Sequence, residues 1–189
     1  MFKKLMAAAL LTTLCVAPAL ADDSMMSGSA MKANPTVGGA PMMATSTIVQ
    51  NASKAPNLTT LVSLVKKADL VDTLSGPGPF TVFAPTNDAF DKVPKATLTA
   101  VGADKALLTK VLTYHVVAGK LDAAAIAAKI KAGGGKAILK TVNGEDLTAS
   151  MSDGKLVLTD AKGGMATVTT ADVYQSNGVV HVIDSVLLP

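Results

Sequence analysis

The strongest constraint on the fold is a series of four glycine-containing turns in the second half of the chain. Dipeptides of this kind favour tight hairpins between antiparallel strands. The segments between them are rich in β-branched residues, which suit a pleated sheet. The turns are Asn143-Gly144, Asp153-Gly154, Gly163-Gly164 and Asn177-Gly178. We therefore predict strands over 137–142, 146–151, 156–159 and 166–173, and a last strand from residue 178 to the final residue.

The first half of the chain shows helical periodicity instead. Apolar residues recur at three- and four-residue spacing over 58–68 and over 104–113. Thr86 and Asp122 are suited to N-cap positions of two further helices, and short strands are predicted over 80–84 and 114–117. Helices with little early β-structure, followed by a β-rich half, predict an α+β fold. We expect a wedge of two β-sheets with several short helices packed at one side.

The N-terminus has the pattern of a secretory signal peptide. Lys3 and Lys4 precede a short apolar run, and Ala19-Leu20-Ala21 resembles a cleavage site. We predict a signal peptide over 1–21, a linker over 22–45 and one domain over 46–189. The chain is expected to be secreted or periplasmic, with no membrane span after cleavage. Cleavage also removes the only cysteine, Cys15, so no disulfide is expected.

The predicted linker is rich in Met, Ser, Gly, Ala and Pro. Its methionines suggest one metal hypothesis, because thioethers are soft ligands that select Cu(I). The alternative is a flexible linker whose methionines serve packing or act as antioxidants. The five residues concerned are Met25, Met26, Met31, Met42 and Met43.

Charge argues against nucleic acid as a partner. The sequence contains no arginine, and removal of the signal leaves 15 lysines against 14 acidic residues, a net charge of about +1. Arginine is the usual bidentate ligand of phosphate and of guanine edges. With aromatic residues at only 3%, neither a basic patch nor a stacking platform is indicated.

The sequence offers no residue set for catalysis. His181, Asp184 and Ser185 are close in sequence, but residues so spaced along a strand point to alternating faces and form no triad. The chain has two histidines, His115 and His181, and neither has a neighbour at metal-ligand spacing. We expect a structural His181 with a hydrogen-bonded ring, no cofactor and no enzyme activity.

Three segments together resemble the fasciclin domain, a secreted adhesion and binding module. They are GPFTVFAPTNDAF at 78–90, TYHVV at 113–117 and NGVVHVIDSVLLP at 177–189. They occur in the order and spacing of that family, and the resemblance extends over roughly residues 46–189. It implies the same wedge of sheets and helices, with Asn177, Gly178 and His181 in a structural motif.

The resemblance also implies candidate recognition residues. In animal fasciclin domains a Tyr-His pair flanked by branched apolar residues is implicated in integrin-dependent adhesion, and Tyr114-His115 matches it. The residues themselves favour a structural role, with both rings mostly buried. A second candidate is Asp172-Val173, where some animal members have an acidic residue followed by Ile. The acid-proline pair that precedes it in those members is Thr170-Ala171 here.

These observations predict a non-enzymatic module for adhesion or protein recognition. Its partner would be a cell-surface or extracellular protein or a second copy of the chain. Two alternatives remain open. One is a carrier of an apolar small molecule such as a carotenoid, since some fasciclin proteins bind carotenoids and the core is rich in Ala, Val and Leu. The other is copper binding by the methionine-rich linker.

Overall fold

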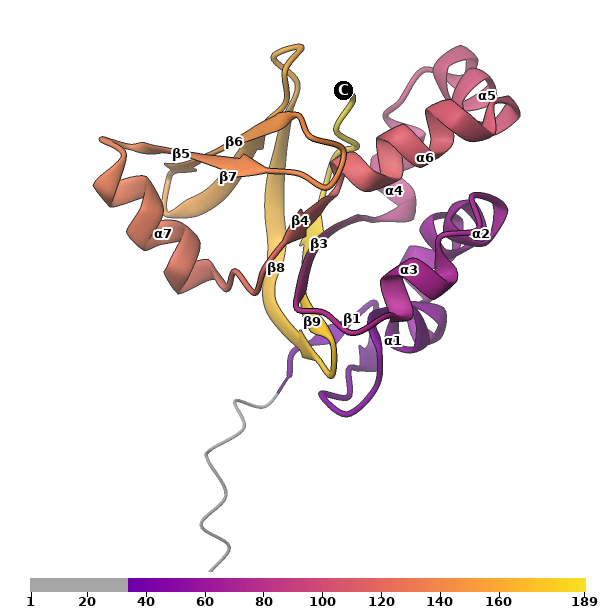
Figure 1. Ribbon diagram of the computed structural model, residues 1–189, viewed down its shortest axis with the longest axis horizontal. Coiled ribbons are helices and arrows are strands. Elements are labelled where there is room, and N and C mark those ends of the chain that lie inside the picture. Colours follow the sequence, from indigo (N-terminus) through magenta and orange to yellow (C-terminus); the bar gives the residue numbers. More distant parts are fainter. Residues whose placement is uncertain (1–33) are drawn as a thin grey trace, which may run out of the picture. The chain divides into compact units, whose positions relative to one another are not determined.

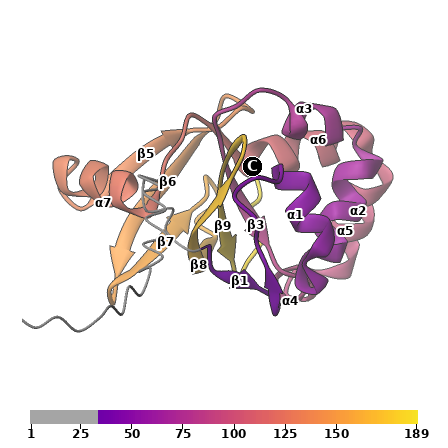
Figure 2. The same ribbon diagram turned by 90° about the horizontal axis from the view of Figure 1, so that it is seen from below.

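The computed structural model describes residues 34–189, so the predicted signal peptide and most of the predicted linker lie outside the described residues. Within the described part, a twisted sheet separates helix α7 from the other helices (Figure 1). The same separation is visible in the perpendicular view (Figure 2). The helices are α1 (Ile48–Lys54), α2 (Thr59–Lys67), α3 (Val71–Ser75), α4 (Asn87–Asp91), α5 (Lys95–Ala103), α6 (Lys105–Tyr114) and α7 (Ala123–Ala132).

Seven strands form one sheet in the order β4-β3-β9-β8-β7-β6-β5. Strands β3 and β9 are parallel, and the other neighbours are antiparallel. The long strand β8 belongs to both halves of this sheet. A bridge between Val117 and Thr141 brings the two outer ends together, so the sheet is nearly closed. The strands are β3 (Phe80–Pro85), β4 (Val116–Ala118), β5 (Lys136–Lys140), β6 (Asp146–Ser152), β7 (Lys155–Thr159), β8 (Met165–Gln175) and β9 (Gly178–Ile183).

The sheet buries two separate hydrophobic clusters. One lies between helices α1, α2, α3 and α6 and strands β3, β4, β8 and β9. The other is enclosed by β5–β8 and helix α7, whose Ile126 and Ile130 are buried in it. The predicted α+β class, with several short helices packed on the β-structure, is therefore confirmed; the two expected sheets are joined into one through β8, and α7 lies apart from the other helices.

Local capping signals were predicted well. The Thr86 side chain accepts from the Ala89 N–H at the start of α4, and Asp122 accepts from Ala125 N–H at the start of α7. Each bond satisfies a backbone donor that the first helical turn leaves without a partner.

Two predicted strand boundaries were wrong. Tyr114 is the last residue of helix α6 rather than part of a strand, because the amphipathic pattern continues to it and its side chain is buried. Strand β9 ends at Ile183 and does not reach the last residue. At the next residue a side chain replaces the backbone partner of β8: Asp184 donates its N–H to Thr167 O at 3.1 Å, but the Thr167 N–H donates to the Asp184 carboxylate at 2.8 Å.

Part of the predicted linker is folded onto the domain. Residues 36–41 form a small hairpin of strands β1 (Thr36–Val37) and β2 (Ala40–Pro41). Val37 and Met42 are buried in the first hydrophobic cluster. Val37 within the hairpin and Met42 directly after it therefore anchor this segment, which the sequence predicts as part of a linker.

Asn177 joins three segments at the head of the parallel β3–β9 pair. Its backbone O accepts the Phe80 N–H at 3.1 Å, and its side-chain amide donates to Leu74 O at 2.7 Å. Its Oδ1 accepts the Ile48 N–H at 3.2 Å. One side chain thus ties the start of α1 and the end of α3 to the sheet.

Gly178 should be intolerant of any side chain. A Cβ at this position would lie 2.0 Å from Phe80 O, a backbone atom of the neighbouring strand. We expect Gly178→Ala to lower the free energy of unfolding by about 1–3 kcal/mol, because the two strands must separate locally. Urea unfolding would measure this loss.

The matched control is Gly102→Ala. A Cβ there meets nothing within 4 Å, and Gly102 lies inside helix α5. That variant should gain about 0.5–1 kcal/mol, since Ala is the better helix former. Equal stabilities of the two variants would contradict this account of Gly178.

Candidate functional site

Tyr114, a candidate recognition residue, is buried at the end of α6 with a relative exposure of 0%. Its hydroxyl donates to Asp146 O and accepts the Ala161 N–H, each at 3.2 Å. Burial raises its pKa, so the phenol stays neutral. The side chain therefore joins α6 to β6 and to the loop after β7.

His115 follows Tyr114 and is also buried, at 3% exposure. Its Nδ1 lies 2.8 Å from Val111 O, which only accepts, and its Nε2 lies 3.1 Å from the Leu187 N, which only donates. These partners fix a neutral imidazole protonated at Nδ1. Burial lowers its pKa to about 4, against the raising effects of the Val111 bond and of Asp160.

His181, in the middle of strand β9, has a similar environment. Its Nε2 donates to Leu121 O at 2.9 Å, its Nδ1 accepts the Asp172 N–H at 3.3 Å, and its ring stacks on Phe83 with centroids 5.6 Å apart. Burial lowers the pKa of this ring as well.

The hydrogen bonds of the two histidines limit the chemistry available to them. Backbone groups occupy all four ring nitrogens. The His181 ring bonds neither Asp184 nor Ser185, whose hydroxyl donates to the Asp184 carboxylate instead. Within residues 34–189, no group of three or more His, Cys, Asp or Glu side chains is arranged to hold a metal ion.

Asp172 and Val173 lie at an irregular point of strand β8, where the register with β9 shifts. Asp172 has φ 58° and accepts the Ala123 N–H on its carboxylate at 2.7 Å. Val173 is 1% exposed. The pair thus ties β8 to the start of α7, and the Val173 side chain is withdrawn from any surface.

A concave surface of about 390 Å³ lies where three loops meet at the head of the β3–β9 pair. It is formed by the segment 77–79, Lys120 and residues 175–178. The exposed Lys120 places its ammonium 5.2 Å from the centroid of the half-buried Tyr174 ring. We name this the loop surface.

Buried hydrogen bonds hold the loop surface in place. The Thr81 hydroxyl donates to Gly119 O at 2.7 Å and accepts the Leu121 N–H at 2.8 Å, so both neighbours of Lys120 are fixed to β3. Gly119 N–H also donates to Pro79 O at 3.0 Å. Asn177 fixes the opposite side, as described above.

Sequence reasoning found Asn177 and Gly178 but missed Lys120 and Tyr174 as parts of one site. Lys120 lies on the loop before α7 and Tyr174 lies near the end of strand β8, and they share no spacing motif. The one local signal was the turn itself, since a polar loop at the end of a strand is a common recognition site.

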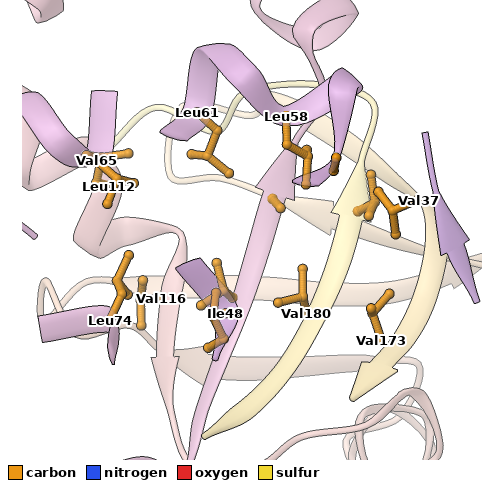
Figure 3. Packing of buried hydrophobic residues seen from close by; sticks show 14 of the residues in the cluster. Val37, Ile48, Leu58, Leu61, Val65, Leu74, Leu112, Val116, Val173 and Val180 are labelled. Carbon is orange, nitrogen blue, oxygen red and sulfur yellow. The ribbon is translucent and has the colours of Figure 1, made fainter. Parts of the chain in front are cut away.

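A second feature is an apolar cavity of about 40 Å³ in the first hydrophobic cluster. Figure 3 shows side chains of α1, α2 and strands β8 and β9 converging on this region, among them Ile48, Leu61 and Val180. A hydrogen bond between the Asn51 and Gln175 side chains lies at its polar margin. A further cavity of about 30 Å³ shares Leu61, Leu112 and His115 with it.

The methionine hypothesis is only partly within reach of the structure. Met25, Met26 and Met31 lie outside the described residues. Met42 is buried in the core, whereas the Met43 side chain is 53% exposed. Asn51 holds this segment through bonds with the Met43 backbone, at 2.7 Å to its O and 3.1 Å from its N.

The Tyr114 hydroxyl should contribute to stability rather than to a surface contact. We expect Tyr114→Phe to lose about 1–3 kcal/mol, because the Ala161 N–H is left without its partner. Tyr114→Ala should lose about 3–5 kcal/mol, and His115→Ala should also destabilise the domain.

Tyr174→Phe is the matched control in chemical denaturation, since the Tyr174 hydroxyl makes no hydrogen bond to a described residue. Unchanged stability of the Tyr114 and His115 variants would instead indicate exposed recognition residues.

The buried His115 predicts a stability that falls in acid. Its pKa is about 4 in the folded chain against an ordinary value of 6.5. The unfolded chain therefore binds a proton first as the pH falls. The stabilising effect is complete above pH 6.5 and is lost progressively between pH 6.5 and about 4, by about 3 kcal/mol.

Urea unfolding at several pH values would measure this slope, and His115→Gln is the comparison. The Gln amide can also accept from the Leu187 N–H and donate to Val111 O, but it does not titrate. Part of the pH dependence of stability should remain in His115→Gln, because the lowered pKa of His181 acts in the same direction. An identical slope in wild type and His115→Gln would refute the assignment.

Known proteins share both the sequence and the fold of this chain. Protein sll1483 of Synechocystis is 48% identical over 145 residues, covering 76% of this chain and 73% of that protein. Immunogenic protein MPB70 of Mycobacterium bovis is 38% identical over 195 residues, covering 97% of this chain and 93% of that protein. Cell surface glycolipoprotein MPB83 of the same species is 37% identical over 162 residues, covering 82% of this chain and 67% of that protein.

The solved structure of a FAS1 domain pair from the insect cell adhesion molecule Fasciclin I matches with a TM-score of 0.63 and 19% sequence identity. The match covers 76% of this chain and 51% of that chain, so this protein spans about half of the insect domain pair. The family model for the Fasciclin domain matches residues 56–189. With this match and relatives of such identity, the chain belongs to the fasciclin domain family.

Proposed function

We propose that the protein is a secreted, non-enzymatic module for adhesion or protein recognition and that the loop surface is its contact site. The observation that carries this proposal is the position of Lys120, which lies beside the Tyr174 ring at the end of strand β8 and on a loop that the buried Thr81 side chain holds. A contact site on rigid loops loses little conformational entropy on binding.

The chemistry of the loop surface suits a protein partner. Lys120 offers a cation beside an aromatic ring, and Ser176 and the backbone of 77–79 are exposed around them. An aromatic anchor next to a charged group is typical of interface hot spots. Because the surface is small, the contact would be weak and would gain strength from several copies acting together.

A non-enzymatic role is supported by the state of the two histidines. Both are neutral and fully engaged with backbone groups, so neither can exchange a proton with a substrate without breaking the fold. Among the described residues, no hydroxyl or carboxylate side chain makes a hydrogen bond to either ring.

An extracytoplasmic location is supported by the signal-like N-terminal sequence and by the relatives. One of these is named a cell surface glycolipoprotein. Among residues 34–189, no helix has the length and apolar character needed to cross a bilayer.

The test is binding to the cell-envelope fraction of the producing organism. We expect Lys120→Glu to weaken binding about tenfold, since it reverses the one cation of the site and lies on its open face. Lys95→Glu, an equal charge change at the exposed start of α5 and outside the residues that form the loop surface, is the control. Saturation binding of labelled protein measures both. Equal binding of both variants and of wild type would exclude the loop surface.

The second candidate is a carrier of an apolar small molecule, and the cavity under α1 and α2 is the observation that favours it. An internal volume of about 40 Å³ is below that of ligand pockets, which hold several hundred Å³. Helix α1 and the β1–β2 hairpin would therefore have to move outward to admit a ligand. The test is solvent extraction of the native protein followed by mass spectrometry. One apolar compound per chain would support the carrier role, and no such compound would contradict it.

The third possibility is copper binding by the methionines. Among the described residues, Met43 is the methionine of this group whose side chain is exposed and could bind the ion. Met42 would have to leave the core to take part. Titration with Cu(I) is the measurement that distinguishes this role from packing.

A further inference from the structure

The segment that follows β9, residues 184–188, runs between the two hydrophobic clusters, and we name it the strap. Val186 packs against the first cluster, and Leu187 belongs to the second cluster at 0% exposure. Leu188 lines both the cavity of about 30 Å³ and an open groove of about 430 Å³ on α5 and α6. The strap is therefore part of the wall between a closed space and an open one.

The cavity behind the strap is mostly apolar. Helices α2, α4, α5 and α6 line it, and His115 and Thr97 are its polar side chains. The open groove shares Thr97, Val101, Val111 and Leu188 with the cavity. Movement of the strap away from the helices would therefore join the two spaces into one deep apolar groove.

Side chains rather than backbone groups hold the middle of the strap. The Leu187 N–H donates to His115 Nε2 at 3.1 Å, and the Leu188 N–H donates to Asp160 Oδ2, also at 3.1 Å. Both acceptors are titratable, whereas a backbone carbonyl keeps its lone pairs at any pH. A proton can therefore change how firmly the strap is held.

His115 is the acceptor that a proton affects most. A neutral imidazole accepts at Nε2, but a protonated ring carries hydrogen on both nitrogens and accepts no hydrogen bond. The Leu187 N–H would then face another N–H and would lose its partner inside the protein. Among the described residues, His115 is the one titratable side chain that lines the cavity.

Charged groups face this region from several elements. The Asp160 carboxylate, on the loop after β7, favours a protonated His115 ring, but burial outweighs it and lowers the pKa of the ring to about 4. The other charged side chains lie at the margins of the strap and of the outer groove, and they are Lys92, Lys110, Glu145, Lys162 and Asp184. His115 thus stays neutral while the strap is closed.

We propose that the strap is released by acid and uncovers an apolar groove on α2, α4, α5 and α6 while the sheet stays folded. The proton enters with the smallest opening that frees the His115 ring, since an exposed ring has its ordinary pKa of 6.5. The ratio of open to closed strap therefore rises about tenfold per pH unit as the pH falls from 6.5 to about 4. Above pH 6.5 the neutral ring keeps the strap closed.

The experiment is amide hydrogen exchange of the purified chain, followed by NMR and corrected for the intrinsic effect of pH on exchange. Protection of the Leu187 and Leu188 amides should fall about 30-fold between about pH 7.5 and about pH 5. Low concentrations of urea should not change these two rates, because a local opening exposes little surface. The amides of β9 should exchange faster in urea, since their exchange requires global unfolding.

The matched variants are His115→Gln and His181→Gln. In His115→Gln the amide keeps both hydrogen bonds but does not titrate, so the pH dependence of the strap amides should be lost. His181→Gln removes the other buried histidine, which makes no bond to the strap, and the pH dependence should remain. Asp160→Asn leaves one acceptor oxygen for three N–H groups, so it should open the strap about tenfold more at every pH.

Fluorescence of anilinonaphthalene sulfonate measures the uncovered apolar groove. With wild type the fluorescence should rise between about pH 6.5 and about pH 5 while the far-ultraviolet circular dichroism stays constant. His115→Gln should not show this rise.

Several results overturn the proposal. Strap amides that follow urea as the β9 amides do show that the strap opens only with global unfolding, and wild type alone decides this. A pH dependence that survives in His115→Gln, or that is also lost in His181→Gln, excludes His115 as the trigger. An Asp160→Asn strap that is no more open than that of wild type excludes the anchoring bond. A dye signal that appears only with loss of circular dichroism excludes the groove.

The strap shares no residue with the loop surface, so its release is independent of the proposed function. It adds a surface that is uncovered in acid to the one that is present at neutral pH. Lys120→Glu should accordingly leave the exchange of the Leu187 and Leu188 amides unchanged.

Discussion

The rest of the structure depends on the parallel pairing of β3 and β9. All six residues of β9 are buried, and the strand is bonded on both sides, to β3 and to β8. A parallel pair needs a long crossover, because the chain must return to the same end of the sheet. Helices α4–α7 and strands β4–β8 all lie within this crossover. The pairing therefore positions both hydrophobic clusters and brings the three loops of the loop surface together.

Much of this architecture follows from local signals in the sequence. The glycine-containing turns and the β-branched runs between them identify β5–β9, and Thr86 and Asp122 mark where α4 and α7 begin. The order of strands in the sheet does not follow in this way, since it is set by contacts between distant segments. The same limit explains the errors. Tyr114 ends helix α6 and not a strand, and its hydroxyl bonds two distant residues, Asp146 and Ala161. Neighbouring residues in the sequence do not reveal these bonds.

The candidate site illustrates the same division. The sequence marks Asn177 and Gly178 as a turn, and the structure adds that the Asn177 side chain joins α1 to α3 while its backbone O bonds β3. It marks two histidines in apolar surroundings but not their partners. Each ring bridges backbone groups that would otherwise be buried without a hydrogen bond. Lys120 and Tyr174 carry no motif, so their proximity emerges only from the fold.

The sharing of β8 between the two halves of the sheet has a consequence for cooperativity. The second hydrophobic cluster is joined to the remainder through β8 and the Asp172–Ala123 bond, but Phe83 of β3, Ile183 of β9 and Tyr114 of α6 are also members of it. The Tyr114 hydroxyl bonds Asp146 O and the Ala161 N–H as well. Neither half of the sheet can therefore open without exposing buried side chains of the other half. The domain should thus unfold as one cooperative unit rather than in two steps.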